Sequence, residues 1–157
     1  MAEKFKAPVE KGKTYTIDIL RLGSNGEGVG RVENFTVFVD GALPGETVTA
    51  RITFVKKQYA TGRLEKVQKP SEHRVKPPCS VYAECGGCQL QHLSYEGQLA
   101  EKRQQVQDAV ERIGKLKDIP VLPTLGADDP WAYRNKMQLP AGGDKRSLHI
   151  GCFAEKS

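Results

Sequence analysis

The stretch Cys79-Ser-Val-Tyr-Ala-Glu-Cys85-Gly-Gly-Cys88-Gln-Leu-Gln-His92 holds three of the four cysteines in this 157-residue chain. Their spacing is C-x5-C-x2-C, and two glycines allow the backbone to turn sharply between the last two cysteines. Zinc ligands are commonly paired as C-x2–4-C, which the first gap exceeds, whereas iron–sulfur proteins include the spacing C-x4-C-x2-C. The spacing therefore favours an iron–sulfur cluster, with a zinc site, or free or disulfide-bonded cysteines, as alternatives.

Charge and hydropathy limit the class of protein. The formal net charge is +5, which favours a polyanionic partner. No apolar run approaches the roughly 18 residues of a membrane span, and residues 1–13 lack the apolar segment of a secretory signal. We therefore expect a cytoplasmic protein that has no membrane partner and whose cysteines stay reduced.

The segment before the cysteines has the pattern of a small β-domain. Runs rich in β-branched and aromatic residues predict four strands, at 14–20, 35–39, 48–55 and 59–67. The glycine-rich residues 23–30 are interpreted as tight turns or a bulge between strands, and the sequence Leu43-Pro-Gly-Glu46 is interpreted as a turn. Short strands with frequent turn signals are typical of a small barrel or sandwich.

Basic residues are concentrated in the second half of this domain. Residues 51–76 contain eight Lys or Arg residues and two Glu residues. Lys56, Lys57 and Tyr59 form an expected hairpin tip, where cations could contact phosphates and the ring could stack on a base, as in proteins that bind single-stranded or loop RNA. A solubilising face, or lysines that protect an edge strand, explains the same pattern equally well.

After the cysteines, the sequence predicts one amphipathic helix and one hairpin. Ser94 is the expected N-cap, and the apolar positions that we expect to lie in a core are Tyr95, Leu99, Val106, Val110, Ile113 and Leu116. Residues 131–139 and 148–153 are interpreted as paired strands joined by a turn at 141–144. Because a lone hairpin is marginal in water, we expect the chain to be a piece of a larger protein.

Residues 11–75 resemble a TRAM domain, an RNA-binding β-barrel of the OB type. The residues that carry the resemblance are Gly26-Glu-Gly-Val-Gly30, Val37-Phe-Val39, Gly41-Ala-Leu-Pro-Gly-Glu46 and Tyr59.

The rest of the chain resembles the iron–sulfur RNA (uracil-C5)-methyltransferases that modify ribosomal RNA. The matching residues are Pro78-Cys79, Cys85-Gly-Gly-Cys88-Gln-Leu-Gln-His92, Tyr95, Gln98-Leu99, Lys102, Arg112-Ile-Gly114 and Tyr133-Arg-Asn-Lys-Met-Gln138. These enzymes use S-adenosylmethionine to methylate carbon 5 of a uridine.

The two resemblances imply a β-rich fold that also contains α structure, arranged as an OB-like barrel, a cysteine loop, one amphipathic helix and the first hairpin of an α+β central domain. The implied segments are a flexible tail (1–10), the TRAM barrel (11–69), a linker with the cysteine loop (70–93), and the helix with an incomplete central domain (94–157). The methyl-donor domain of the family has no counterpart here. We therefore assign no catalytic and no S-adenosylmethionine-binding residue, and expect the chain alone not to methylate RNA.

The resemblance also implies the ligands of a 4Fe–4S cluster. Cys79, Cys85 and Cys88 match three of its cysteines. A count of cysteines would nominate Cys152 as the fourth, but it aligns with a hydrophobic position of the family, so the fourth ligand is expected outside the chain.

The expected partner is ribosomal RNA, and no DNA partner is expected. The protein itself is expected to be a monomer. The residues predicted to contact RNA are Lys56, Lys57, Tyr59, Arg63, Arg74, Arg134 and Lys136. Two other functions fit the same residues: a stand-alone RNA-binding module with a cysteine-bound metal, and a zinc-stabilised structural protein.

Overall fold

The computed structural model describes residues 7–154 of the chain. The chain divides into two compact units with a boundary between Arg74 and Val75. Within the described residues, no helix combines the length and the apolar character needed to cross a membrane.

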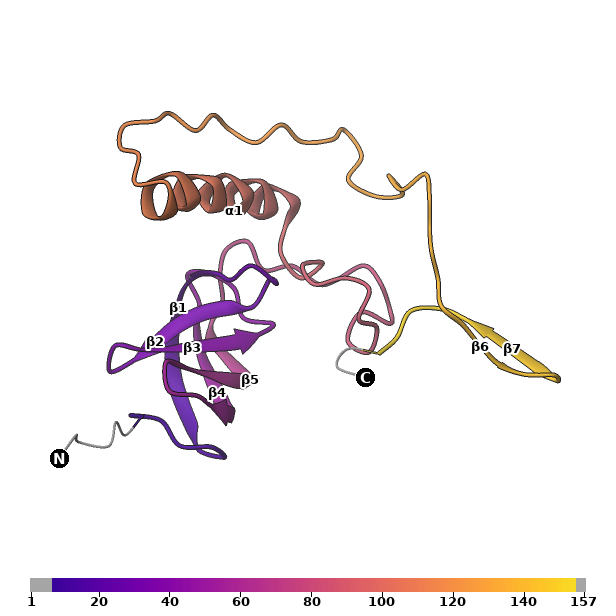
Figure 1. Ribbon diagram of the computed structural model, residues 1–157, viewed down its shortest axis with the longest axis horizontal. Helices are drawn as coiled ribbons and strands as arrows, with labels where there is room; N and C mark the ends of the chain where they lie inside the picture. Colours follow the sequence, from indigo (N-terminus) through magenta and orange to yellow (C-terminus); the bar gives the residue numbers. More distant parts are fainter. Residues whose placement is uncertain (1–6, 155–157) are drawn as a thin grey trace. The chain divides into compact units, whose positions relative to one another are not determined.

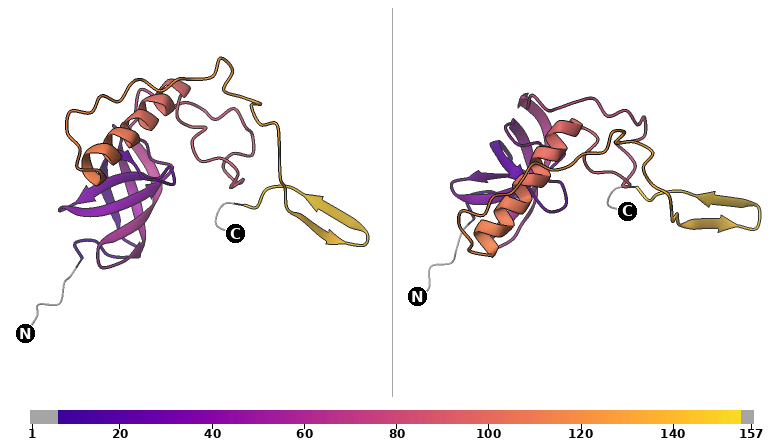
Figure 2. Two further views of the ribbon diagram at one scale, coloured as in Figure 1. Left: turned by 45° about the horizontal axis from the view of Figure 1, so that its top comes forward. Right: turned by 90° about the horizontal axis from the view of Figure 1, so that it is seen from above.

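The first unit is a closed five-stranded barrel (Figures 1 and 2). The order around it is β1-β2-β3-β5-β4, and β4 pairs with β1 to close the sheet. All pairs are antiparallel except β3 with β5. The strands are β1 (Thr14–Leu22), β2 (Gly28–Val32), β3 (Phe35–Asp40), β4 (Thr47–Val55) and β5 (Tyr59–Lys69). The expected OB-like barrel is confirmed.

Alternation along the strands fills the barrel with apolar side chains. In β3, Phe35, Val37 and Val39 are buried, whereas the residues between them are only partly covered. The core begins earlier than the expected domain start at residue 11, because Val9 is 2% exposed and packs in the same cluster. Residues 1–6 of the expected tail lie outside the described residues.

Strand β2 was not expected, because the glycine-rich residues 23–30 were interpreted as turns. Glycine is disfavoured in strands, so the sequence pattern hides this one. The barrel requires it at Gly30, where a side chain would collide with Ile17 and the carbonyl oxygen of Asp18 on β1. Close approach of two backbones therefore explains the glycine.

The second unit contains the helix α1 (Tyr95–Asp108), which continues as the π-helical turn η1 (Ala109–Ile113). The predicted cap is confirmed, since the Ser94 hydroxyl accepts a hydrogen bond from the Gly97 amide at 3.1 Å. The prediction of a buried apolar face is wrong for three of its six residues, because Val106, Ile113 and Leu116 are 52%, 82% and 54% exposed. The other three, Tyr95, Leu99 and Val110, are partly covered.

The final hairpin is shifted along the chain from its predicted position. Its strands are β6 (Ala141–Asp144) and β7 (Ser147–Ile150), so residues 141–144 form a strand and not the turn. The turn lies at 145–146, where the Asp144 carboxylate accepts hydrogen bonds from the amides of Arg146 and Ser147. Residues 131–139 have no regular structure, because their β propensity finds no partner strand among the described residues.

Candidate functional site

The outer face of the barrel brings aromatic side chains together across β3 and β5. The parallel register places Thr36 beside Tyr59, and Phe38 beside Thr61. The rings of Phe38 and Tyr59 meet edge to face, with centroids 5.4 Å apart and planes at 89°. Side chains that the sequence separates by 21 positions therefore form one surface.

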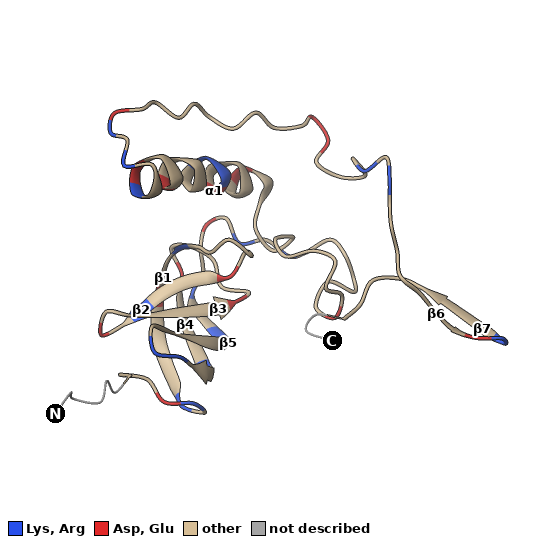
Figure 3. Cartoon of the chain, in the orientation of Figure 1, with Lys and Arg blue, Asp and Glu red and all other residues tan. Residues whose placement is uncertain are grey.

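Four of the residues predicted to contact RNA lie on the β4–β5 hairpin. The Lys56 amide donates to the Tyr59 carbonyl at 2.8 Å and closes the turn. The Lys56 ammonium lies 5.5 Å from the centroid of the Tyr59 ring, within the range of a cation–π interaction. Lys57 is exposed next to it, and Arg63 follows on the same face of β5 as Tyr59. Figure 3 shows Lys and Arg in blue on the strands and loops of the barrel.

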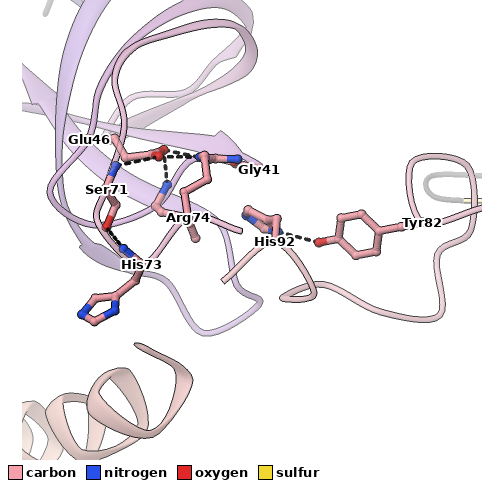
Figure 4. A network of polar contacts seen from close by, with 8 residues as sticks. Gly41, Glu46, Ser71, His73, Arg74, Tyr82 and His92 are labelled. Atoms are coloured by element: carbon pink, nitrogen blue, oxygen red, sulfur yellow. Dashed lines mark hydrogen bonds and ion pairs between the residues drawn. The ribbon is translucent and has the colours of Figure 1, made fainter. Parts of the chain in front are cut away.

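Arg74, also predicted to contact RNA, forms hydrogen bonds within the first unit instead. Its Nε and Nη2 donate to the two oxygens of Glu46 at 2.5 and 2.8 Å, and Nη2 also donates to the Gly41 carbonyl at 2.7 Å (Figure 4). The Glu46 side chain is fully buried. Because this guanidinium is already engaged by a buried carboxylate, we leave Arg74 out of the proposed RNA surface.

Glu46 is held as a charged carboxylate by its neighbours. It also accepts from the amides of Leu43 at 2.9 Å and Ser71 at 3.2 Å. Burial opposes the charge and is the largest single influence, but the hydrogen bonds from Arg74, Leu43 and Ser71 together lower the pKa of Glu46 below its usual value. This network fastens residues 71–74 to the barrel.

The cysteine loop lies next to Cys152, a neighbour that the spacing of the motif did not predict. The amide of Gly86 donates to the Phe153 carbonyl at 3.0 Å, and Cys85 forms an antiparallel bridge with Ala154. This pairing places Cys152 beside Cys85. At the other end of the motif, the Cys79 amide donates to the Gln91 side chain at 3.3 Å.

The electrostatics of Cys152 reflect this proximity. The charge of Cys85 raises the pKa of Cys152, with smaller contributions from burial, from a hydrogen bond to Cys85 and from Cys88, while Arg134 opposes the shift. Like charges this close disfavour the thiolate.

A metal or cluster would find suitable donors here, although the donors are not gathered around one point. A Cβ at Gly87 would lie 3.3 Å from the sulfur atoms of both Cys85 and Cys152, so this glycine leaves the space between them open. Thiolates are the ligands that zinc and iron–sulfur clusters prefer. Within residues 7–154, however, no three His, Cys, Asp or Glu side chains lie close enough together to hold a metal ion.

His92, at the end of the motif, is buried, with 5% of its surface exposed. Tyr82 contacts the Gln89 carbonyl at 2.7 Å and His92 Nδ1 at 2.6 Å (Figure 4). A carbonyl can only accept, so the single hydroxyl proton of Tyr82 goes to Gln89, and the proton between Tyr82 and His92 belongs to Nδ1. His92 thus orders the cysteine loop through its Nδ1–H tautomer.

The last two residues predicted to contact RNA, Arg134 and Lys136, are exposed in the irregular segment before β6. The Arg134 guanidinium lies 6.0 Å from the centroid of the Tyr133 ring. A hydrogen bond and the charge of Tyr133, followed by Cys88 and Cys152, raise the pKa of Arg134. Tyr133 therefore contributes most to the raised pKa of Arg134, and the two cysteines add to it.

The barrel matches a known protein family. The family profile described as the TRAM domain matches residues 8–64. Residues 8–64 therefore carry a TRAM domain. The match begins one residue before Val9, consistent with the place of that side chain in the barrel core.

Curated relatives extend the similarity beyond the TRAM barrel. A protein of Clostridium tetani named "uncharacterized RNA methyltransferase" is 49% identical over 96% of this chain, and one of Halalkalibacterium halodurans with a similar name is 49% identical over 94%. The alignments cover 32% of each relative. The chain thus spans about a third of the length of the curated relatives that it matches.

Two solved structures are similar to part of the chain. The Pyrococcus abyssi tRNA (uracil-54, C5)-methyltransferase is 30% identical, with 68% of this chain and 23% of that chain aligned and a TM-score of 0.40. A conserved protein of Methanococcus maripaludis is 34% identical over 39% of this chain and 87% of its own, with a TM-score of 0.38. Scores this low do not establish a shared overall fold.

Sequence reasoning missed two aromatic residues near the predicted hairpin. Phe38 was assigned only to a strand, although its outward position follows from its alternation with Val37 and Val39. Phe54 was also assigned to a strand, and its exposure, 48%, could not be read from alternation because the strand is irregular there.

Proposed function

We propose that this chain is the RNA-binding and cluster-binding part of an S-adenosylmethionine-dependent RNA methyltransferase that acts on carbon 5 of uracil in ribosomal RNA. The observation that carries the proposal is the 49% identity, over 96% of the chain, to a protein named as an RNA methyltransferase. The TRAM domain and the basic, aromatic hairpin of β4 and β5 support a role in holding the RNA.

In this proposal the barrel binds RNA and positions it for a reaction elsewhere in a longer protein. Enzymes that modify a base must take it out of its stack, so a surface that holds the neighbouring nucleotides aids the reaction. Lys56 and Lys57 would contact phosphates, and Tyr59 would contact a base. We assign no catalytic residue to the chain.

The cysteine set would hold a 4Fe–4S cluster through Cys79, Cys85 and Cys88, with a fourth ligand from outside the chain. The cluster would act structurally, as a cross-link between the loop and the segments that provide its ligands. On the protein side, Gly87 leaves room beside the sulfur atom of Cys85, and the Tyr82–His92 hydrogen bond orders the loop that carries the three cysteines.

The activity is tested with RNA that carries tritium at carbon 5 of uridine. Methylation replaces that hydrogen, so tritium appears in the solvent when S-adenosylmethionine is added. We expect release by the full-length product of the gene and none by the 157-residue chain alone. Release by the chain alone would contradict the assignment of catalysis to other residues, and methylation at another atom of the RNA would contradict uracil-C5 specificity.

The cluster is tested by measuring iron, acid-labile sulfide and zinc in protein purified without oxygen, for the wild type and for Cys85→Ser and Cys152→Ser. Iron and sulfide that are lost in Cys85→Ser and unchanged in Cys152→Ser support the proposal. Loss in Cys152→Ser as well would make Cys152 a ligand. Stoichiometric zinc without sulfide would support the alternative of an RNA-binding zinc module.

A further inference from the structure

Phe54 is an exposed aromatic residue on the TRAM barrel. We propose that Phe54, Lys56 and Tyr59 form a stacking platform for unpaired nucleotides of a single-stranded RNA. The inference rests on the proposed function and makes it more specific, because it names both the form of RNA and the side chains that bind it.

A β-bulge directs Phe54 outward. From the buried Ile52, simple alternation would point Phe54 into the barrel. The register between β4 and β5 shifts between Ile52 and Phe54, so that Ile52 pairs with Gly62 and Phe54 pairs with Thr61. Thr53 stabilises the irregularity, because its hydroxyl donates to the Thr61 carbonyl at 3.1 Å. Bulges commonly redirect a side chain next to a binding site.

The two rings of the platform are linked by one cation. The Lys56 ammonium lies 5.8 Å from the centroid of Phe54 and 5.5 Å from that of Tyr59. Phe38 also contacts the Tyr59 ring edge to face. A phosphate bound to Lys56 would therefore place the adjacent bases beside two aromatic faces.

The charges around the platform suit a polyanion. Arg31 is opposite Thr36, which is next to Tyr59, and Arg63 lies further along β5, so both project from the same outer face. Two acidic residues also belong to this face: Asp40 is beside Arg63, and Glu65, two positions further along β5, is paired with Arg51. With Lys56, Lys57 and Arg51 included, the cations named here outnumber these two acids.

Protection of β5 as an edge strand does not explain the lysines. The barrel is closed, and residues 60–63 of β5, next to the hairpin tip, pair with β3 on one side and with β4 on the other. This part of β5 has no edge that could recruit another chain, so the lysines have no such edge to protect there.

An unpaired strand is the occupant that fits best. Stacking on Phe54 or Tyr59 requires the flat face of a base, which is covered by its neighbours in a duplex. Base–aromatic stacking tolerates any sequence, whereas contacts between lysine and phosphate depend on salt.

The test measures fluorescence anisotropy of a labelled single-stranded uridine oligonucleotide of about 12 nucleotides, within the range that one such barrel covers, and of a matched duplex. The 157-residue chain is compared with Phe54→Leu, which keeps an apolar side chain without a ring, with Lys56→Gln, and with Leu20→Ala, a change at an exposed residue of β1. Circular dichroism and thermal melting confirm that each variant is folded.

We expect Phe54→Leu to weaken binding of the single strand about fivefold to tenfold, as for loss of one stacking contact, with the same dependence of log Kd on log salt. Lys56→Gln should reduce the slope of that dependence by about 0.7, the value for one phosphate contact on a single strand. Leu20→Ala should bind like the wild type.

Each other outcome has a distinct meaning. Tight binding by the wild type with no loss in a folded Phe54→Leu overturns the platform and leaves the RNA-binding function intact. Equal or stronger binding of the duplex overturns the single-stranded assignment. No binding of either RNA by the wild type overturns both the platform and the proposed role of the barrel. A photocrosslink from 5-iodouridine in the oligonucleotide to Phe54 or Tyr59 would support the platform directly.

Discussion

The two units of the chain differ in how far their apolar residues are buried. Among residues 7–154, fourteen of the 15 buried hydrophobic residues lie in the barrel unit, and 15 of the 17 large exposed ones lie at or beyond Val75. In the barrel every strand has two partners, so one side of each strand faces a common interior. In the described part of the second unit, one helix and a two-stranded sheet offer no comparable interior. A regular spacing of apolar residues therefore leads to burial only where the topology places another strand or helix against the apolar face.

The largest effect is expected where the barrel buries a charge. Arg74→Met should lower the free energy of unfolding by about 3–5 kcal/mol, because it leaves the buried Glu46 carboxylate without its cation. Arg51→Met is the matched control, since Arg51 contacts Glu65 at the same 2.5 Å but is 56% exposed. That change should cost less than about 1 kcal/mol. Urea denaturation followed by circular dichroism measures both, and equal losses would show that burial does not distinguish the two pairs.

A second prediction compares one residue type in the two units. Ile52→Ala should cost about 2–5 kcal/mol, because Ile52 is 1% exposed and its loss leaves a cavity in the barrel core. Ile113→Ala, at a residue that is 82% exposed, should change stability by no more than about 0.5 kcal/mol. The same urea titrations apply. A large loss from Ile113→Ala would mean that the second unit buries this side chain in solution.

Acid should weaken the barrel gradually through Glu46. The folded state lowers the pKa of this carboxyl below its usual 4.5, so its contribution to stability is complete above that pH and is lost as the pH falls toward the lower folded value. Thermal melting between pH 3 and pH 6 should show the fall at the low end of this window. Glu46→Gln should reduce the slope there, and an unchanged slope would assign the acid sensitivity to other carboxyl groups.

The smallest effect is expected in the second unit. Tyr82→Phe removes the hydroxyl that joins the Gln89 carbonyl and His92 Nδ1, and should cost about 0.5–1.5 kcal/mol for the cysteine loop. Hydrogen exchange of the amides at 79–92 measures the effect locally, and those of β3 serve as an internal control. Faster exchange in β3 as well would show that the loop and the barrel are not independently stable.

The sequence by itself determined the parts that depend on local pattern. The strands β1, β3, β4 and β5, the Ser94 cap and the cluster of cations at 56–57 follow from residue types at short spacing. The cysteine motif was visible in the same way, although spacing could not show that Cys152 lies beside Cys85.

Only the tertiary structure decided what depends on distant neighbours. It made a strand of the glycine-rich segment because β2 must pass close to β1 at Gly30, and it moved Phe54 to the surface through a register shift against β5. It also joined Arg74 to the buried carboxylate of Glu46, 28 positions earlier in the chain. Each of these outcomes depends on which backbones meet in space, and local propensity contains no information about that.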